Sequence, residues 1–201
     1  MTDDLPFSQA SENNKTAILE VFSRHFGDKD SLLELAGGTG QHAVFFASLF
    51  TYLTWQSSDI PSNVSSLNRR IGSAELENLP LAIPIDVNDK PWGCGAYDAI
   101  FTANSLHIMS AESVESFFSE VASHITQGGL LIVYGPFKYN NKFTTESNEE
   151  FDLWLKVRDP VSGVRDFEWV NSLAESAGLI LLEDNPMPAN NQMLVWKKSS
   201  A

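Results

Sequence analysis

The segment 32–42 constrains this chain most, because a short apolar run there leads straight into a cluster of glycines. An amphipathic helical stretch, Ala43–Phe50, follows it directly. An apolar run, an acidic residue (Glu34), glycines and a helix together predict a buried parallel strand, a tight turn and a helix N-terminus. In an α/β fold such a turn presents backbone N–H groups and the positive end of the helix dipole to a ligand. Gly37, Gly38 and Gly40 let the backbone approach that ligand closely and take positive φ.

Two classes of cofactor fit this turn. As G-x-G-x-x-A, Gly38, Gly40 and Ala43 match the dinucleotide fingerprint. As E-x-[GA]-x-G-x-G, Glu34, Ala36, Gly38 and Gly40 resemble motif I of the class I S-adenosylmethionine (SAM) dependent methyltransferases, with Ala36 where that family often has its first glycine. The second interpretation is favoured, because a carboxylate before the glycines suits a ligand that has an ammonium group and no pyrophosphate. A strand-to-helix turn that binds nothing is the third interpretation.

The length of 201 residues predicts a single domain with a substantial core. Hydrophobic residues make up 43% and charged residues 19%, a composition that excludes wholesale disorder. Residues 1–11 are expected to form a flexible N-terminal arm. Residues 12–201 are expected to form the domain, with a polar insertion at about 140–163.

The charge balance bears on the partners of the chain. There are 13 Lys+Arg against 26 Asp+Glu, for a formal net charge of −13. Binding to a nucleic-acid backbone needs a basic surface, and anionic membranes attract basic segments, so the sequence predicts neither partner. It predicts a small-molecule substrate instead.

The cysteine and histidine content points to a reducing compartment and to no metal. Cys94 is the sole cysteine, so no internal disulfide can form, which fits the cytoplasm. The four histidines lack metal-ligand spacing, and no cysteine cluster accompanies them. The N-terminus is acidic and polar, unlike a secretory signal, and no run of about 18 apolar residues predicts a transmembrane helix.

The order of the elements predicts an α/β fold with a mostly parallel sheet and helices on both faces. Strands are expected at 31–35, 52–57, 81–85, 97–102 and 130–134, and helices at 14–26, 43–50, after Pro61, after Ser110 and at 166–177. Leu179–Glu183 and Met193–Trp196 are two further strands without room for a helix between them, so they must pair antiparallel. This ending resembles the seven-stranded, Rossmann-like sheet of the class I methyltransferases.

Acidic residues end the first three predicted strands. They are Glu34, Asp59 and Asp86, and ligands of α/β sheets bind outside the carboxyl ends of the strands. Asp59 lies 19 residues after Gly40, where a carboxylate can accept both ribose hydroxyls of a nucleoside. In methyltransferases a carboxylate in the position of Asp86 can receive the adenine amino group. The neighbours Ile60 and Val87 join the expected cofactor site, and a helix cap or a solvated loop is the alternative for each aspartate.

The fourth and fifth strands bring three more polar side chains to the same edge. Asn104 is expected at the cofactor, and His107 is a candidate general base because imidazole titrates near neutral pH. Capping of a loop carbonyl is the alternative for His107. Tyr134 is expected to orient a nucleophile, or else to be a core aromatic residue with a satisfied hydroxyl.

The insertion and the last turn supply candidate substrate residues. A polar insertion beside a cleft is often a lid, and Asp152 and Arg158 lie in this one. The guanidinium of Arg158 is expected to select a carboxylate or phosphate by bidentate pairing, unless it pairs with Asp152 or Asp159 and only folds the loop. Asn190 and Asn191 suit a turn, and their amides could also line the site.

Several short sequence motifs along the chain carry a more specific resemblance. They are Glu12-Asn13-Asn14-Lys15, Leu33-Glu34, Gly38-Thr39-Gly40-Gln41-His42, Trp55-Gln56-Ser57-Ser58-Asp59, Tyr134-Gly135-Pro136-Phe137, Phe151-Asp152, Arg158-Asp159-Pro160, Arg165-Asp166 and Met187-Pro188-Ala189-Asn190-Asn191. On these motifs the whole chain resembles the methyltransferase-like protein twenty-six family, a branch of the class I SAM-dependent methyltransferases. The resemblance implies the fold and the cofactor, SAM, but supplies no substrate. Asn14 and Lys15 join the residues expected at the substrate. Asn13 departs from the family, for which an arginine is expected at this position.

Three functions remain open at this point. The leading one is a SAM-dependent methyltransferase that transfers a methyl group to a small-molecule acceptor, largely by aligning a nucleophile behind the reactive sulfonium methyl group. The second is a SAM-binding regulatory module that transfers nothing. The third is an NAD-dependent oxidoreductase, which predicts that the protein binds NAD and tolerates the loss of Asp86.

Overall fold

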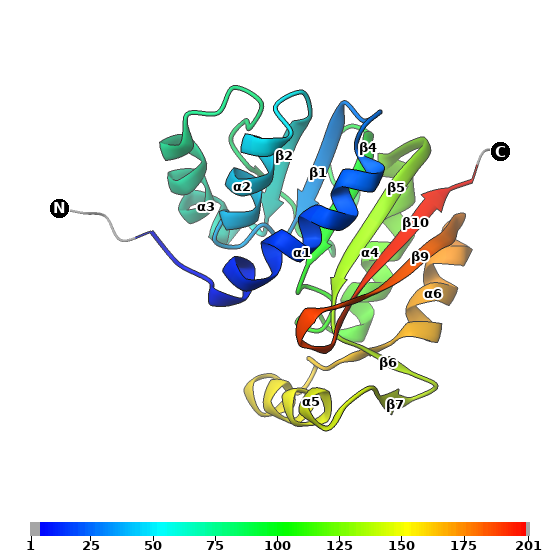
Figure 1. Cartoon of the computed structure of the whole chain (residues 1–201). Coiled ribbons are helices and arrows are strands. Elements are labelled where there is room, and N and C mark those ends of the chain that lie inside the picture. Colours follow the sequence, from blue (N-terminus) through cyan, green and yellow to red (C-terminus); the bar gives the residue numbers. More distant parts are fainter. Residues whose placement is uncertain (1–4, 200–201) are drawn as a thin grey trace.

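A computed structural model describes residues 5–199 and places a seven-stranded sheet at the centre of the molecule (Figure 1). The strand order is β3-β2-β1-β4-β5-β10-β9. These strands are β1 (Ser31–Leu35), β2 (Thr54–Asp59), β3 (Ile83–Pro84), β4 (Tyr97–Ala103), β5 (Ile125–Gly135), β9 (Leu179–Met187) and β10 (Asn191–Lys198). Strands β1 to β5 pair in parallel, whereas β10 runs antiparallel to both of its neighbours. The predicted fold class is therefore confirmed.

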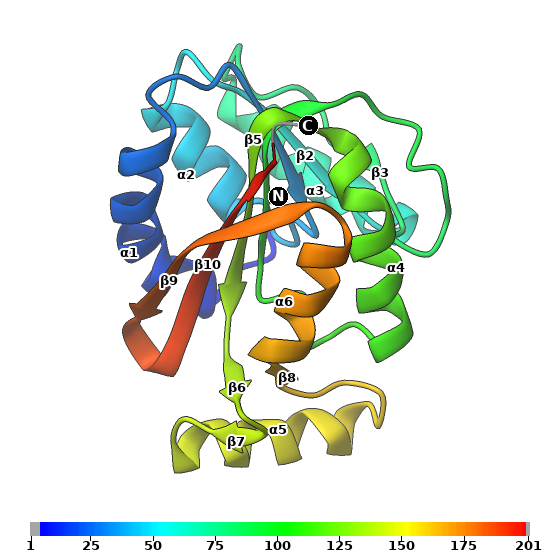
Figure 2. The same ribbon diagram turned by 90° about the vertical axis from the view of Figure 1, so that its right-hand side faces the viewer.

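Helices cover both faces of this sheet (Figure 2). The helices of the described residues are α1 (Gln9–His25), α2 (Gln41–Leu49), α3 (Pro61–Ala74), α4 (Ala111–Val121), α5 (Glu146–Arg158) and α6 (Phe167–Ser176), with the short 3-10 turns η1 (Ala122–His124) and η2 (Pro188–Asn190). Helices α1, α2 and α3 pack on one face, and α4 and α6 on the other. Among residues 5–199, no helix has the length and apolar content needed to cross a membrane.

Two apolar layers separate the helices from the sheet. Leu32 of β1 faces the layer under α1 and α2, whereas the next residue, Leu33, faces the layer under α4 and α6. This alternation follows from the two-residue period of a strand, and a parallel sheet covered on both sides needs apolar side chains in both directions. Buried strands of this kind fix the positions of the loops at their carboxyl ends.

The first helix begins earlier than its apolar stripe predicts. Ser8 caps α1 by accepting a hydrogen bond from the N–H of Ser11, so residues 9–11 of the expected flexible arm are helical. Residues 1–4 of that arm lie outside the described residues.

The third strand is shorter than its apolar run, 81–85, predicts. Only Ile83 and Pro84 pair with β2, at Ser58 and Asp59. Proline has no N–H to donate, which restricts it to sheet edges, and β3 is the edge strand. Because the pairing with β2 ends at Pro84, the following residues can turn toward the carboxyl ends of β1 and β2.

The polar insertion is ordered. It holds α5 and, with its flanks, a small sheet of β6 (Phe137–Tyr139), β7 (Lys142–Phe143) and β8 (Arg165–Asp166). Figures 1 and 2 show α5 beyond the carboxyl end of β5, across the edge where the predicted site residues gather.

Candidate functional site

The glycine turn between β1 and α2 has one open side. Three of its residues take positive φ, namely Ala36 (57°), Gly38 (58°) and Gly40 (75°). A Cβ atom on Gly37 would lie 2.3 Å from Ser57 Oγ, and one on Gly40 would lie 2.8 Å from a methyl carbon of Leu67. On Gly38 it would meet only Ala36 O, at 3.9 Å. The turn is therefore packed against β2 and α3 at Gly37 and Gly40 and is free to meet a ligand at Gly38.

The amides of this turn are already used within the protein. Gly37 donates to Ser58 O (2.9 Å), Gly38 to Asp59 Oδ2 (2.7 Å) and Gly40 to Gly37 O (2.9 Å). A pyrophosphate would have to displace these bonds and would meet the Asp59 carboxylate as a like charge. These three glycine amides are therefore not free for the pyrophosphate that the dinucleotide fingerprint would bring to the turn.

A hollow opens below the turn, at the carboxyl ends of β1, β2 and β3. We call it the acidic hollow. It encloses about 520 Å³ with its mouth and is lined by Leu35, Ala36, Asp59, Ile60, Ile85, Asp86, Val87, Asn88, Met109 and Ser113. The Ile60 side chain remains 43% exposed there. Apolar walls with two carboxylates suit a flat heterocycle that carries hydrogen-bond donors.

The carboxylate of Asp59 anchors the turn and keeps one acceptor position. Its Oδ2 accepts from Gly38, and its Oδ1 accepts from the N–H of Ile60 (2.8 Å) and from Asn63 Nδ2 (2.9 Å). A carboxylate has about four acceptor positions, so one remains on Oδ2. Asp59 can thus accept one hydroxyl as it stands, and the expected pair of ribose hydroxyls would require the Asn63 amide to leave.

Asp86 lies two residues beyond β3, on the wall of the acidic hollow. Its Oδ1 accepts from the N–H (2.9 Å) and from Nδ2 (3.1 Å) of Asn88. This bond closes an Asx turn that fixes the carboxyl group at the rim. The structure therefore brings Asp86 together with Asp59, Ile60 and Val87, as the sequence predicts.

Glu34 lies outside this hollow, contrary to its expected meeting with the ligand. It is 2% exposed, and its Oε2 accepts from Ser57 Oγ (2.7 Å) and Trp55 Nε1 (3.1 Å) on β2. Burial raises the pKa of Glu34 to about 7, against the lowering effect of these two donors. Glu34 braces β2 behind Gly37 rather than lining the hollow.

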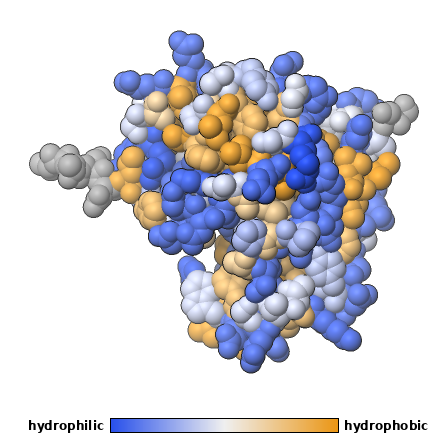
Figure 3. All heavy atoms as spheres, viewed as in Figure 1, coloured by the Kyte–Doolittle hydropathy of each residue, from blue (hydrophilic) through white to orange (hydrophobic). Residues whose placement is uncertain are grey.

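A second hollow lies at the carboxyl ends of β4 and β5. Its two adjoining lobes, of about 500 and 750 Å³ with their mouths, share Ala10, Asn104, Ala189 and Asn191. We call it the asparagine hollow. It is lined by Ala10, Asn13, Asn14, Asn104, Tyr134, Pro136, Ser147, Asn148, Phe151, Pro188, Ala189, Asn190 and Asn191. Figure 3 shows a notch in the surface between the lobe that contains α5 and the body above it.

The two hollows lie on neighbouring strands. Leu35, on the wall of the acidic hollow, pairs with Thr102 of β4, two residues before Asn104. Asn104 takes a φ of 56°, and its N–H donates to Tyr134 O (2.8 Å). A ligand that extends from the acidic hollow over the end of β1 would thus reach Asn104.

Tyr134 joins a buried polar network. Burial raises the pKa of its hydroxyl, which the side-chain amides of Asn14 and Asn191 partly oppose. Asn14 Oδ1 lies 2.7 Å from His42 Nε2. Tyr134, Asn14, Asn190 and Asn191 therefore come together as expected, and Tyr134 stays a protonated donor at neutral pH.

His107 does not line either hollow. It is 6% exposed, and its ring packs edge-on against Phe151, with 5.3 Å between the centroids. Burial and, secondarily, the charge of Arg165 lower its pKa to about 4. The imidazole is neutral at pH 7 and a weaker base than expected.

Three predicted substrate residues also lie away from the hollows. Asp152 is buried and accepts from Lys156 Nζ (2.6 Å) and from the N–H of Val164 (2.7 Å), so it folds the end of the insertion. Arg158 is exposed, with its guanidinium carbon 4.7 Å from the Trp154 ring centroid. Lys15 pairs with Glu12 and lies over the Phe45 ring. None of these three side chains lines a hollow, so Arg158 does not lie where it could select an anionic substrate.

Sequence reasoning missed the closure of the site by the N-terminal segment. Gln41 Oε1 accepts from the N–H of Ser8 (2.5 Å), and Arg70 donates to Pro6 O (2.5 Å) and Thr39 O (2.6 Å). These bonds hold residues 6–8 against the glycine turn and place Ala10 and Asn13 in the asparagine hollow. The N-cap signal at Ser8 could have revealed the early start of α1.

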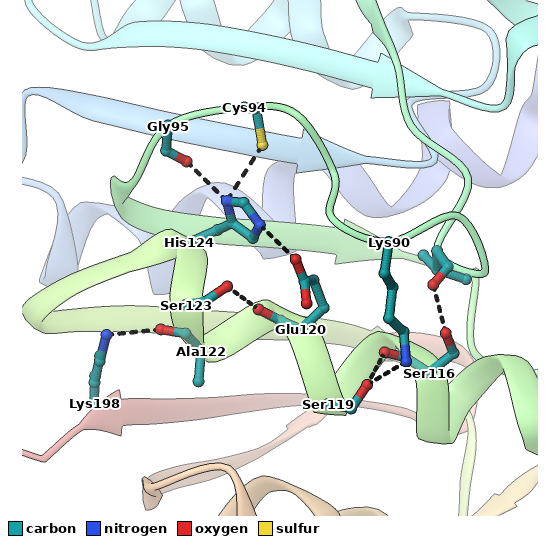
Figure 4. A network of polar contacts seen from close by, with 11 residues as sticks. Lys90, Cys94, Gly95, Ser116, Ser119, Glu120, Ala122, Ser123, His124 and Lys198 are labelled. Atoms are coloured by element: carbon teal, nitrogen blue, oxygen red, sulfur yellow. Dashed lines mark hydrogen bonds and ion pairs between the residues drawn. The ribbon is translucent and has the colours of Figure 1, made fainter.

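A cysteine–histidine–glutamate cluster joins the loop before β4 to α4 and η1 (Figure 4). It lies near the amino end of β4, whereas both hollows lie at carboxyl ends of the strands. His124 Nδ1 is 3.5 Å from Cys94 Sγ but 3.0 Å from Gly95 O, and its Nε2 is 3.3 Å from Glu120 Oε1. A carbonyl oxygen only accepts, so Nδ1 carries a proton and cannot take one from the thiol. Burial also raises the pKa of Cys94. The cluster therefore ties the loop before β4 to α4 and is not a nucleophile.

Comparisons with known proteins agree with this geometry at the level of the fold. The family described as "Protein of unknown function (DUF938)" matches residues 5–198. Among solved structures, an O-methyltransferase family protein from Burkholderia thailandensis is 19% identical, with a TM-score of 0.81 over 93% of this chain and 57% of that one. Human N-acetylserotonin methyltransferase in complex with SAM is 18% identical (TM-score 0.74; 92% and 55%), and PigF with SAH is 17% identical (0.76; 90% and 54%). The chain thus spans a little over half the length of these proteins.

Proposed function

The chain belongs to the family described as "Protein of unknown function (DUF938)", and we propose that it is a SAM-dependent methyltransferase acting on a small-molecule acceptor. The observation that carries this proposal is the pair of hollows at the carboxyl ends of one sheet. One has the walls and carboxylates that a nucleoside needs, and the other opens beside it at the end of β4.

The residues of the acidic hollow fit the adenosine part of SAM. Ile60, Ile85, Val87 and Met109 would contact the faces of the adenine ring, and Asp86 would accept a hydrogen bond from its amino group. The free acceptor position of Asp59 would take a ribose hydroxyl. When bound, SAM supplies an electrophilic methyl group on a sulfonium centre. The chain's own task is then to place an acceptor beside Asn104 and to exclude water.

Two alternatives fit less well. An NAD-dependent oxidoreductase would need free amides for a pyrophosphate, whereas Gly37, Gly38 and Gly40 donate within the protein. A SAM-binding module would need only the acidic hollow, whereas this chain also encloses the asparagine hollow. Without its mouth, the larger lobe of the asparagine hollow still holds about 380 Å³, which lies within the range of small-molecule sites.

The comparisons support the proposal through the fold. An O-methyltransferase family protein shares it at 19% identity, and N-acetylserotonin methyltransferase in complex with SAM and PigF with SAH share it at 18% and 17%. We also propose that the chain belongs to the methyltransferase-like protein twenty-six branch and that it acts in the cytoplasm. These proposals rest on the sequence motifs and on the single cysteine.

Calorimetric titration of the protein with SAM, SAH and NAD tests the cofactor. We expect SAM and SAH to bind and NAD not to bind. Asp59→Ala should weaken SAM by about 1–3 kcal/mol, the value of a hydrogen bond to a charged group. Asp86→Ala should weaken it in the same range. The matched control is Asp89→Ala, because Asp89 is exposed and lies outside the hollow. Tighter binding of NAD than of SAM would overturn the proposal.

A further inference from the structure

The asparagine hollow is uncharged, although it belongs to a protein with a formal net charge of −13. Within residues 5–199, no Asp, Glu, Lys, Arg or His side chain lines either of its lobes. Asparagine amides and the Tyr134 hydroxyl supply its polar groups, and Phe151 with two prolines supplies apolar contact. A carboxylate, a phosphate or a strongly hydrated ammonium ion that entered would lose hydration without gaining an opposite charge, which is costly, whereas a methylated onium ion has no N–H or O⁻ to leave unpaired. The hollow therefore suits an uncharged ligand with hydrogen-bonding groups.

The same lining offers no base. An alcohol must lose a proton when it is methylated, and the usual acceptors of that proton are a carboxylate, a neutral imidazole or an amine. Burial keeps Tyr134 protonated, and the ring of His107 packs against Phe151 outside the lining. An acceptor atom that already has a free lone pair and has no proton to lose avoids this need.

Resting on the proposed function, we infer that the acceptor is an uncharged small molecule methylated at a pyridine-type nitrogen or a thioether sulfur, so that the product is a permanent cation. The lone pair of that atom forms the bond to the methyl carbon, and the electron pair of the broken carbon–sulfur bond stays on the sulfur of SAH. The positive charge passes from one sulfonium to the methylated atom, and no proton moves.

The aromatic lining suits such a product. Tyr134 and Phe151 are the aromatic residues in the lining of the two lobes, among the residues described. One face of the Phe151 ring is stacked on Trp154, with 5.7 Å between the centroids, so the lining can offer its other face and the Tyr134 ring. An aromatic face attracts an onium cation by about 0.5–2 kcal/mol.

Fractionated metabolites test this inference. A cell extract is separated on ion exchangers at pH 7 into neutral, anionic and cationic pools, and each pool is incubated with the protein and tritiated SAM. We expect at least tenfold more label to enter the neutral pool, and the labelled product to be retained on a second pass over the cation exchanger. Ligand-observed NMR on the same pools, with SAH-loaded protein, should show binding in the neutral pool without any turnover.

Each other outcome overturns part of the argument. Label in the anionic or cationic pool refutes the uncharged acceptor, and a labelled product that flows through the cation exchanger refutes the onium product. If calorimetry shows SAM binding but no pool is labelled or bound, this inference fails while the cofactor assignment stands. If SAM does not bind, the proposed function itself fails.

A matched pair of variants locates the binding. Tyr134→Phe removes one hydroxyl from the hollow and should weaken the NMR binding signal about fivefold or more, as loss of a hydrogen bond does. Tyr139→Phe removes a hydroxyl that donates to Asp184 outside the hollow, and should leave the signal unchanged. Equal signals from both variants would refute binding at Tyr134, and SAM titrations of both verify that they fold.

Discussion

Replacement of Glu34 by glutamine should change how the stability of this protein depends on pH. The carboxyl group is buried behind the glycine turn, and burial raises its pKa from 4.5 to about 7. At about 1.36 kcal/mol for each pH unit, the difference of about 2.5 units corresponds to about 3 kcal/mol. Glu34→Gln keeps an oxygen for the Ser57 and Trp55 donors and removes the titration.

The direction of this pH dependence follows from the pKa of Glu34, which is higher in the native protein than in the unfolded chain. Below pH 4.5 the carboxyl is protonated in both states, so its stabilising effect is fully present. As the pH rises to 7 the unfolded chain ionises first, and the native state loses up to about 3 kcal/mol relative to it. Above pH 7 the loss is constant. His42 and His107, whose pKa values are lowered to about 4, act in the opposite direction, but they are present in both proteins.

Urea denaturation of wild type and Glu34→Gln between pH 4 and pH 8 measures this difference. The variant should gain about 3 kcal/mol over wild type across the range, with most of the gain between pH 4.5 and pH 7. Glu77→Gln, a change at an exposed glutamate, serves as the control. Its free energy of unfolding should differ from that of wild type by the same amount at every pH. A flat difference for Glu34→Gln as well would show that the buried carboxyl does not carry a proton at neutral pH.

Three further variants probe the parts around the site. Gly37→Ala should cost about 1–3 kcal/mol of stability in urea denaturation, because its Cβ would lie 2.3 Å from a serine Oγ on β2. The control is Gly72→Ala, whose Cβ would meet nothing within 4 Å, so this variant should be as stable as wild type or more stable. His107→Gln should leave the pH profile of kcat/KM between pH 6 and pH 8 unchanged, and loss of an inflection there would restore the general-base role. Arg165→Met removes donors to three backbone carbonyls and should speed proteolysis of the segment 159–164 about tenfold, whereas Arg158→Met should not.

The sequence predicts best what short-range chemistry determines. The strand 31–35 and the helix start at Pro61 have the observed bounds, because an apolar run before glycines and a proline at a first helical turn are local signals. The antiparallel ending follows from the short gap between its strands. The presence of Asp59 and Asp86 in the same hollow follows from the rule that ligands bind at the carboxyl ends of parallel strands.

The remaining differences depend on tertiary contacts. Nothing near Glu34 in the sequence shows that Trp55 and Ser57 of β2 will satisfy it and remove it from the ligand. Helix α5 lies within the segment predicted as a polar insertion, although Thr145 caps it and basic residues lie in its last turn. Its buried face is partly polar (Asn148, Asp152) and its outer face is partly apolar (Leu153, Val157), so the helix lacks a clear apolar stripe in the sequence. Asparagine tolerates the positive φ that Asn104 takes, but nothing local in the sequence shows that its N–H will donate to Tyr134 O.

The two hollows differ in when the growing chain can complete them. The acidic hollow draws on residues 35–113, a continuous stretch, whereas the asparagine hollow needs residues near both chain ends, from Ala10 to Asn191. Strand β10 must insert between β5 and β9, pairing Leu130 with Lys197, before η2 reaches its place. We therefore expect a nascent chain to acquire the surface for the nucleoside first, and to complete the surface for an acceptor only after residues 188–191 have been synthesised.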